Sequence, residues 1–315
     1  MRVVIPGGSG HVGTIFARAF HSRGDEVIVL SRRPEQAPWR VVAWDGETLD
    51  AWSSEFEGAD AIINLAGQSV NCRYTEKNRR EIVDSRVKST NAVGEAIAKA
   101  AKPPRVWLQA STATVYAHRY DAPNDETTGI IGGSEPHAPD TWRFSIDVVK
   151  AWERVTNESP TTLTRKVLMR TAIVMSPDRG GPFDMLLRLV RFGLGGQAGN
   201  GKQFVSWIHD QDLVRTVIWL LENQELEGPV NLAAPNPLPN SEFMRLLREA
   251  WGAPFGLPAS KWMLELGAFA LRSETELILK SRRVVPTRLM QSGFVFEFPT
   301  WREAAKDLCE RARRN

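Results

Sequence analysis

Cysteines and long apolar runs, which mark several classes of protein, are scarce in this chain. Its 315 residues contain two cysteines, Cys72 and Cys309, and neither belongs to a C-x-x-C pair or to another metal-ligand spacing. We therefore expect neither a disulfide scaffold nor a bound metal. No apolar run reaches the roughly 18 residues that a membrane-spanning helix needs, and the first residues form a strand pattern rather than a signal peptide. A cytoplasmic protein with no membrane partner is expected.

A strong excess of charge of one sign is also absent. The 40 Lys and Arg residues stand against 37 Asp and Glu residues, which gives a formal net charge of +3. The basic residues are scattered, whereas a nucleic-acid partner held through its phosphates needs a basic stripe. We expect no nucleic-acid partner. The expected partner is a small-molecule substrate, bound by a monomer or a homodimer.

Short β-branched runs alternate with helical patterns in the first half of the chain. This alternation predicts the α/β class, with a doubly wound parallel sheet of six or seven strands and helices on both of its faces. The expected strands are Arg2–Pro6, Glu26–Leu30, Arg40–Trp44, Ala61–Leu65, Arg105–Ala110 and Lys166–Arg170.

The character of the sequence changes after about residue 170, where glycine and proline cluster and helical patterns dominate. We expect residues 1–170 to form the sheet domain and residues 171–315 to form a smaller, mainly helical domain for substrate binding and closure. A run near residues 228–233 is expected to return to the edge of the sheet, so that the two domains interleave. Further helices are expected at Asn240–Gly252, Pro258–Leu271 and Trp301–Ala312.

A glycine-rich turn follows the first expected strand and leads into a helix. Gly7, Gly10 and Gly13 have the spacing G-x-x-G-x-x-G. In this context the first glycine allows a tight turn, the second lets the backbone approach a pyrophosphate, and the third lets the helix pack close to the strand. The helix N-terminus favours the phosphate charge. The turn predicts a Rossmann-type dinucleotide site made by Gly7, Gly8, Ser9, Gly10, His11, Val12 and Gly13.

The end of the second expected strand indicates which dinucleotide is preferred. NAD sites place Asp or Glu near this position, where the carboxylate binds the ribose hydroxyls. This chain has Ser31, Arg32 and Arg33 instead. A guanidinium group suits a 2′-phosphate because it is charged and presents a planar fork of donors. We therefore expect these three residues to favour NADP(H) over NAD(H).

Small and hydroxyl residues end the next two expected strands. Leu65, Ala66 and Gly67 close the fourth strand, and residues of this size let a cofactor lie across the edge of the sheet where α/β ligands collect. Ala110 and Ser111 end the fifth strand and are followed by further hydroxyl side chains. We expect all five residues to contact the cofactor.

In order and spacing, these motifs resemble the short-chain dehydrogenase/reductase superfamily in its extended, nucleotide-sugar-epimerase-like form. More narrowly, the chain resembles the atypical group called epimerase family proteins, including that group's C-terminal domain of unknown function. The resemblance implies NADP(H) binding and an undetermined substrate. The narrower likeness rests on Asn64–Gly67, Asp84–Arg86, Trp152–Glu153, Phe192–Gly196, Ser206–His209 and Asp212–Leu213.

The chain lacks the catalytic pair that members of this superfamily use, Tyr-x-x-x-Lys on a helix after the fifth strand. One helical turn brings that lysine beside the tyrosine, and its charge lowers the pKa of the phenol. None of the three tyrosines here has a lysine four residues later. Aligning Glu153 with the glutamate that commonly follows the pair puts Ser145 at the tyrosine position and Val149 at the lysine position.

Other side chains must therefore carry any acid–base chemistry. Thr112 falls on the position of the hydroxyl that orients the substrate, and the resemblance makes Tyr116 and His209 candidates for proton transfer. A structural role is the alternative for each of these residues. Substrate contacts are expected from Gln68, Arg86, Phe183 and Trp207.

Two functions are consistent with this sequence. The first is an NADP(H)-dependent oxidoreductase or isomerase that acts on a small polar or nucleotide-linked substrate. The second is a non-catalytic NADP(H)-binding sensor or regulator, which the missing pair favours. The fold alone does not decide between the two.

Overall fold

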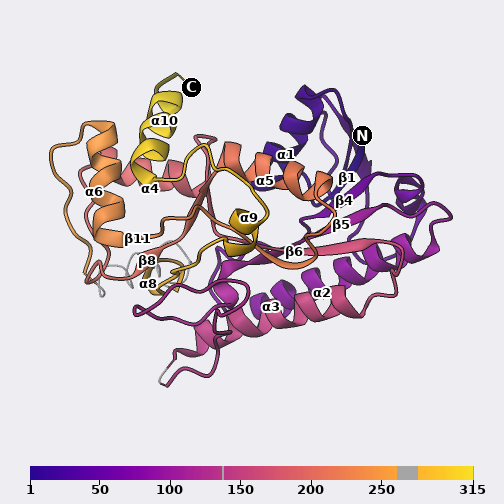
Figure 1. Cartoon of the computed structure of the whole chain (residues 1–315), viewed down its shortest axis with the longest axis horizontal. Coiled ribbons are helices and arrows are strands. Elements are labelled where there is room, and N and C mark those ends of the chain that lie inside the picture. Colours follow the sequence, from indigo (N-terminus) through magenta and orange to yellow (C-terminus); the bar gives the residue numbers. More distant parts are fainter. Residues whose placement is uncertain (137, 261–275, 315) are drawn as a thin grey trace.

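The computed structural model describes residues 1–136, 138–260 and 276–314 (Figure 1). A seven-stranded sheet lies at its centre, with the order β10-β6-β5-β4-β1-β2-β3, and all neighbouring strands are parallel. The order reverses between β1 and β4, which is where open α/β sheets bind their ligands. The strands are β1 (Arg2–Pro6), β2 (Glu26–Ser31), β3 (Arg40–Ala43), β4 (Ala61–Asn64), β5 (Val106–Thr112), β6 (Arg165–Thr171) and β10 (Gly228–Leu232).

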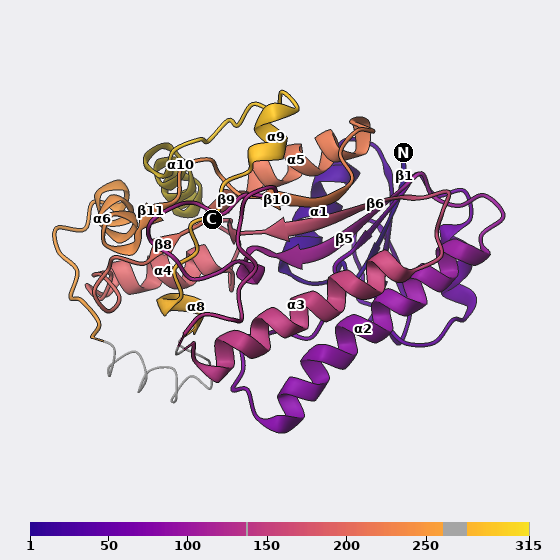
Figure 2. The same cartoon turned by 60° about the horizontal axis from the view of Figure 1, so that its bottom comes forward.

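Helices cover both faces of this sheet (Figure 2). The long helices α2 (Glu76–Lys99) and α3 (Asp140–Glu158) lie side by side on one face. On the opposite face, α1 (His11–Ser22) packs beside α5 (Asp210–Glu222). This arrangement confirms the predicted α/β class and the Rossmann-type, doubly wound architecture.

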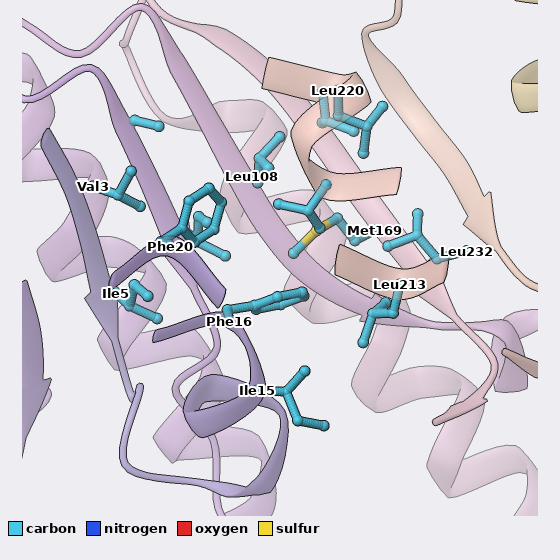
Figure 3. Close-up of a cluster of buried hydrophobic side chains, with 14 of the residues drawn as sticks. Val3, Ile5, Ile15, Phe16, Phe20, Leu108, Met169, Leu213, Leu220 and Leu232 are labelled. Atoms are coloured by element: carbon cyan, nitrogen blue, oxygen red, sulfur yellow. The ribbon is translucent and has the colours of Figure 1, made fainter. Parts of the chain in front are cut away.

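The burial pattern of β1 shows why two layers of helices form. All but its first residue are buried, so both faces of the strand need a cover. Val3 and Ile5 pack with Phe16 of α1 and Leu213 of α5 in one apolar cluster (Figure 3). Val4 points the other way and packs in the cluster beneath α2. Each such buried side chain contributes about 1.5–3 kcal/mol to folding.

The second half of the chain builds a separate apolar cluster around Trp207, Phe243 and Trp301. The rings of Phe243 and Trp301 are stacked with their centroids 4.0 Å apart. The helices around this cluster are α4 (Pro182–Arg191), α6 (Asn240–Trp251) and α10 (Trp301–Arg314). The shorter elements are η1 (Ala51–Phe56), η2 (Ala113–Val115), β7 (Ile173–Met175), β8 (Phe204–Val205), β9 (Trp207–His209), β11 (Leu238–Pro239), α8 (Glu276–Leu279) and α9 (Thr287–Gln291).

Three of the expected elements of the second half are present, whereas residues 258–260, where a further helix is expected to begin, are not helical. β10 lies at the sheet edge beside β6, where the run near residues 228–233 is expected to return. The helices expected at Asn240–Gly252 and Trp301–Ala312 are α6 and α10, whereas most of the helix expected at Pro258–Leu271 lies outside the described residues. Among the helices that are described, none has the length and apolarity that crossing a membrane requires. The domain division near residue 170 stays a prediction.

Candidate functional site

The glycine loop between β1 and α1 contains two glycines that the fold itself requires. Gly7 has a φ of +75°, and a Cβ at this position would lie 2.7 Å from the Cα of Ala66 at the end of β4. A Cβ on Gly13 would lie 2.4 Å from the Cα of Gly8, because α1 packs directly against the loop. No side chain is tolerated at either separation, so the tight turn and the close helix packing are both present as expected.

Gly10 differs from these glycines because the space beside it is open. A Cβ there would meet no neighbouring atom closer than the carbonyl oxygen of Gly7 at 3.7 Å. Gly10 is exposed and is the N-cap of α1, and no side chain caps the first turn of this helix. An uncapped helix N-terminus beside open space favours an anion such as a pyrophosphate.

The ring of His11, the first residue of α1, lies against Gly181. A Cβ on Gly181 would be 2.5 Å from Cε1 of this ring. Gly181 is the N-cap of α4, so the N-termini of α1 and α4 meet beside the glycine loop. The Nε2 atom of His11 is buried, and no residue in the described ranges forms a hydrogen bond with it. A buried nitrogen of this kind calls for a partner, and a phosphate oxygen fits that requirement.

The carboxyl end of β2 brings two arginines next to the glycine loop. The buried hydroxyl of Ser31 donates to the carbonyl oxygen of Arg33 at 2.9 Å and lies 3.1 Å from the hydroxyl of Ser9. These bonds fix the turn and leave Arg32 and Arg33 exposed. Neither guanidinium group has an ion-pair partner in the part of the chain that the structure describes. Two uncompensated positive charges therefore flank the loop, and Arg32 also lines a cavity of about 820 Å³.

The carboxyl end of β4 packs against Arg86 of α2. A Cβ on Gly67 would lie 3.1 Å from Cζ of Arg86, and Nη1 of Arg86 donates to the carbonyl oxygen of Gln68 at 3.0 Å. The guanidinium group lies over the ring of Trp152 at 4.9 Å. Burial lowers the pKa of Arg86 to about 10, which still leaves it a cation at neutral pH. The structure thus brings Gln68 and Arg86 together, through the backbone of Gln68.

The end of β5 uses its hydroxyl groups in local hydrogen bonds. The half-buried hydroxyl of Thr112 accepts from the backbone N–H of Thr114 at 3.2 Å and caps η2. Ser111 donates to Oε1 of Glu153 at 2.6 Å. Glu153 also binds Arg170 through both carboxylate oxygens, at 2.9 and 2.8 Å. The side chain of Ser111 is therefore bound to α3. Its expected contact with the cofactor stays a prediction.

Tyr116 is held in the same buried network, with 2% of the residue exposed. Its hydroxyl donates to Oδ1 of Asn231 at 2.9 Å and accepts from Nη1 of Arg170 at 3.1 Å. Burial raises the pKa of this phenol, although Arg170 opposes the rise. The phenol hydroxyl therefore both donates and accepts a hydrogen bond, and these two bonds join β6, through Arg170, to β10, through Asn231. The predicted role of Tyr116 in proton transfer therefore has no support in this geometry.

His209 is fully buried where β9 meets α5. Its Nδ1 accepts from the backbone N–H of Gln211 at 3.2 Å, so Nε2 carries the proton and donates to Asp307 of α10 at 3.0 Å. The imidazole ring stacks on Phe298 with centroids 3.8 Å apart. These contacts tie α10 to the sheet domain. They account for His209 structurally, and its predicted catalytic role stays without support.

The burial of His209 predicts a loss of stability in acid. Burial lowers the pKa of His209, and the carboxylates of Asp210 and Asp307 oppose that effect while Arg311 adds to it. The folded chain therefore binds fewer protons here than the unfolded chain, whose histidine pKa is about 6.5. Stability is retained above that pH and is lost as the pH falls below it. We expect the urea midpoint of the wild type to drop more between about pH 7.5 and 5.5 than that of His209→Gln; parallel pH profiles would contradict this.

The burial of Phe183 and Trp207 contradicts the prediction that these two residues contact the substrate. Both side chains are fully buried in the cluster beneath α4, α6 and α10, and the ring of Trp207 packs edge-on against Trp301 at 5.0 Å. The sequence pattern places them near the crevice, but the helices of the second half cover them completely. They form core rather than a substrate-contacting surface.

The two α3 positions aligned with the missing pair lie in different surroundings. Val149 is buried beside Tyr116 in a small apolar cluster. The hydroxyl of Ser145 lies 3.4 Å from the hydroxyl of Tyr74, which precedes α2. Sequence analysis does not identify Tyr74, because the contact joins residues 71 positions apart.

The parallel sheet, the glycine loop at its switch point and the flanking helices define a Rossmann-type α/β protein. Its sequence matches the model of the NAD dependent epimerase/dehydratase family over residues 3–233, and the chain belongs to this family. Residues 259–308 match a second model, a domain of unknown function designated DUF1731.

Relatives extend this match over nearly the whole chain. The epimerase family protein SDR39U1 of Bos taurus is 32% identical, with 98% of this chain and 99% of the relative covered. The crystal structure of human SDR39U1 with NADPH has a TM-score of 0.85 at 29% identity, covering 98% of this chain and 99% of the human chain. A nucleoside-diphosphate sugar epimerase from Corynebacterium glutamicum has a TM-score of 0.73 at 27% identity, covering 98% of this chain and 58% of the other.

Proposed function

We propose that this protein binds NADP(H) and acts as an oxidoreductase or isomerase on a small polar or nucleotide-linked substrate. The observation that carries the proposal is the glycine loop, where an open Gly10 and the unpartnered Nε2 of His11 lie at an uncapped helix N-terminus. Arg32 and Arg33 supply positive charge where an NAD site has a carboxylate. Once bound, the cofactor supplies hydride chemistry.

The chain's own residues have separable roles in this proposal. The loop from Gly7 to Gly13 and the ring of His11 hold the pyrophosphate, and Arg32 with Arg33 bind the 2′-phosphate. The backbone of Ala66 and Gly67 lies along the cofactor edge. The NADPH complex of human SDR39U1 supports the choice of cofactor. The likeness to a nucleoside-diphosphate sugar epimerase supports a nucleotide-linked substrate.

The choice of cofactor gives a direct prediction. NADPH is expected to bind more tightly than NADH, and Arg32→Ala is expected to weaken NADPH binding by roughly 1–3 kcal/mol, through loss of a charge-assisted contact. NADH binding changes little, because it has no 2′-phosphate. Isothermal titration calorimetry measures the affinities of the wild type and of Arg32→Ala for NADPH and for NADH.

The matched control removes an arginine before the amino end of β5, a strand inside the sheet. Arg105 precedes β5 and pairs with Asp60 at 3.1 Å, on an exposed surface. Arg105→Ala changes the net charge as Arg32→Ala does, and it is expected to leave both affinities unchanged. Equal affinities of the wild type for NADPH and NADH would overturn the cofactor assignment.

The absence of Tyr-x-x-x-Lys favours a second candidate, a non-catalytic NADP(H)-binding sensor or regulator. Ser145 and Val149 at the aligned positions have no acidic proton and no charge. NADPH oxidation measured against a panel of carbonyl compounds and nucleotide sugars separates the two functions. Turnover supports the enzyme, whereas tight NADPH binding without any turnover supports the sensor.

A further inference from the structure

The imidazole of His11 is the one side chain of the glycine loop that titrates near neutral pH. His11 is partly buried at the first position of α1, and its ring lies against Gly181, the N-cap of α4. A Cβ on Gly181 would be 2.5 Å from Cε1 and 2.7 Å from Nε2 of the ring. Glycine at this position therefore leaves the room that the imidazole occupies. Nε2 is buried and has no hydrogen-bond partner among the described residues, so its hydrogen-bonding capacity is unused.

Two helix N-termini converge on this ring. The N-cap of α1 is Gly10 and that of α4 is Gly181, and neither glycine supplies a capping side chain. Each helix start carries partial positive charge on its free N–H groups. Both ends therefore favour an anion beside the imidazole, and the open space at Gly10 admits one.

The carboxylate in the loop before α4 is already paired. Both oxygens of Asp178 accept hydrogen bonds from the guanidinium group of Arg18 on α1. Burial opposes ionisation of Asp178, but the bonds from Arg18 and a smaller electrostatic effect of His11 hold its pKa below the ordinary value. The Asp178–Arg18 pair is neutral as a unit, so it changes the charge at the ring little.

The charged groups of α4 and of its preceding loop complete these surroundings. Asp184, in the first turn of α4, accepts from the backbone N–H of Gly180 at 2.8 Å and pairs with Arg188 at 2.9 Å. Arg179 is exposed in the same loop. Since both carboxylates near the ring have arginine partners, a bound phosphate is the group that adds negative charge beside His11.

We propose that His11 is a proton-linked ligand of the cofactor, so that binding of the NADP(H) pyrophosphate draws a proton onto the imidazole that Gly181 makes room for. This inference rests on the proposed binding of NADP(H). It adds a regulation of that site by pH, and it holds for an enzyme and for a sensor alike.

The proposed step is a protonation and exchanges no electrons. The proton comes from the solvent and forms an N–H bond at the ring nitrogen that lacks one. An anion beside an imidazole favours its protonated form, and a hydrogen bond from a charged donor to a phosphate oxygen is stronger than one from a neutral donor. Because this coupling is reciprocal, a lower pH must strengthen cofactor binding wherever binding takes up a proton.

The first experiment measures the affinity for NADP⁺ by calorimetry at about pH 6.5 and about pH 8, for the wild type and His11→Gln. Glutamine keeps an N–H donor but does not titrate. We expect the wild type to gain roughly threefold to tenfold in affinity relative to His11→Gln when the pH is lowered. The 2′-phosphate also titrates near pH 6, but it does so against both proteins, so the ratio of their affinities isolates His11. Parallel pH dependence of the two proteins overturns the proposal.

The second experiment counts the protons directly. Titration of NADP⁺ at about pH 7 in Tris and in PIPES, two buffers with different ionisation enthalpies, gives the number of protons taken up on binding. We expect uptake of a fraction of one proton by the wild type and its loss in His11→Gln. The matched control is His21→Gln on the same helix, where the ring packs edge-on against Trp39, and this variant should keep the uptake. A wild type that takes up no proton overturns the proposal, even if His11→Gln fails to fold.

The third experiment tests the pairing of His11 with Gly181. Gly181 has a φ of −80°, which alanine adopts without strain, so the added methyl group acts on the imidazole ring in front of it. Gly181→Ala should weaken NADP⁺ binding by about threefold to tenfold in the wild type and by less than about twofold in His11→Gln. Equal losses in both backgrounds overturn the pairing. Thermal unfolding checks that each variant folds.

The outcomes separate this inference from the proposed function. A wild type that binds NADP⁺ tightly, with the same pH dependence as His11→Gln, overturns the proton linkage and leaves the cofactor assignment intact. A wild type that binds no NADP⁺ at either pH overturns both.

Discussion

Gly10→Val is expected to abolish binding of both NADPH and NADH while the chain still folds. The space beside Gly10 is open in the structure, and an added Cβ meets only the carbonyl oxygen of Gly7, at 3.7 Å. The valine side chain does fill the approach to the N-terminus of α1, which the pyrophosphate needs. Loss of the N-cap glycine costs about 1 kcal/mol of stability. Calorimetry measures the binding, and thermal unfolding measures the fold.

The same substitution at Gly13 is the matched control. A Cβ there would lie 2.4 Å from the Cα of Gly8, and backbone at that distance cannot yield as a flexible side chain does. Gly13→Val should therefore lower the free energy of unfolding by more than the roughly 1–3 kcal/mol of ordinary overpacking. If Gly10→Val instead binds NADPH with the affinity of the wild type, the pyrophosphate does not approach the N-terminus of α1 beside this glycine.

Most of the fold could be predicted from the sequence because its signals are local. The strand at Arg2–Pro6 is buried on both faces, and a short apolar run followed by a glycine turn is the pattern of a central parallel strand. The same reasoning applies to the other strands of the first half. Even the return of β10 to the sheet follows from a local apolar run.

The cofactor part of the site is also local, whereas the rest depends on distant contacts. The roles of Gly7, Gly10 and Gly13 follow from their spacing alone. By contrast, Gly181 meets His11 across 170 positions of sequence and Tyr74 meets Ser145 across 71. No periodicity or spacing records such contacts, so they become visible only once the helices are packed.

Buried aromatic residues show a second limit of sequence reasoning. Trp207 and Phe183 follow turns rich in glycine and serine, a pattern shared by crevice walls and core strands alike. Which of the two applies depends on what covers the side chain. Here Phe183 of α4 and Trp207 of β9 pack in one cluster with buried residues of α6 and α10, so both belong to the core.

Glu153→Gln is expected to destabilise the protein by about 3–5 kcal/mol, because it leaves the Arg170 cation buried without its counter-charge. The side chains of Glu153 and Arg170 are 12% and 9% exposed, and the carboxylate binds both the guanidinium group and the hydroxyl of Ser111. Arg170 also donates to the hydroxyl of Tyr116, so the same network includes this phenol. Urea unfolding at neutral pH measures the change in the free energy of unfolding.

An exposed pair provides the control for this prediction. Glu95 and Lys99 form an i,i+4 pair on α2, 2.6 Å apart and more than half exposed. Glu95→Gln makes the same chemical change and should stay within about 0.5 kcal/mol of the wild type. The double variant Glu153→Leu with Arg170→Met should recover much of the loss, because replacing both partners leaves no buried charge unpaired. Equal costs for Glu153→Gln and Glu95→Gln would mean that the network joining α3, β5 and β6 adds no more stability than a surface ion pair.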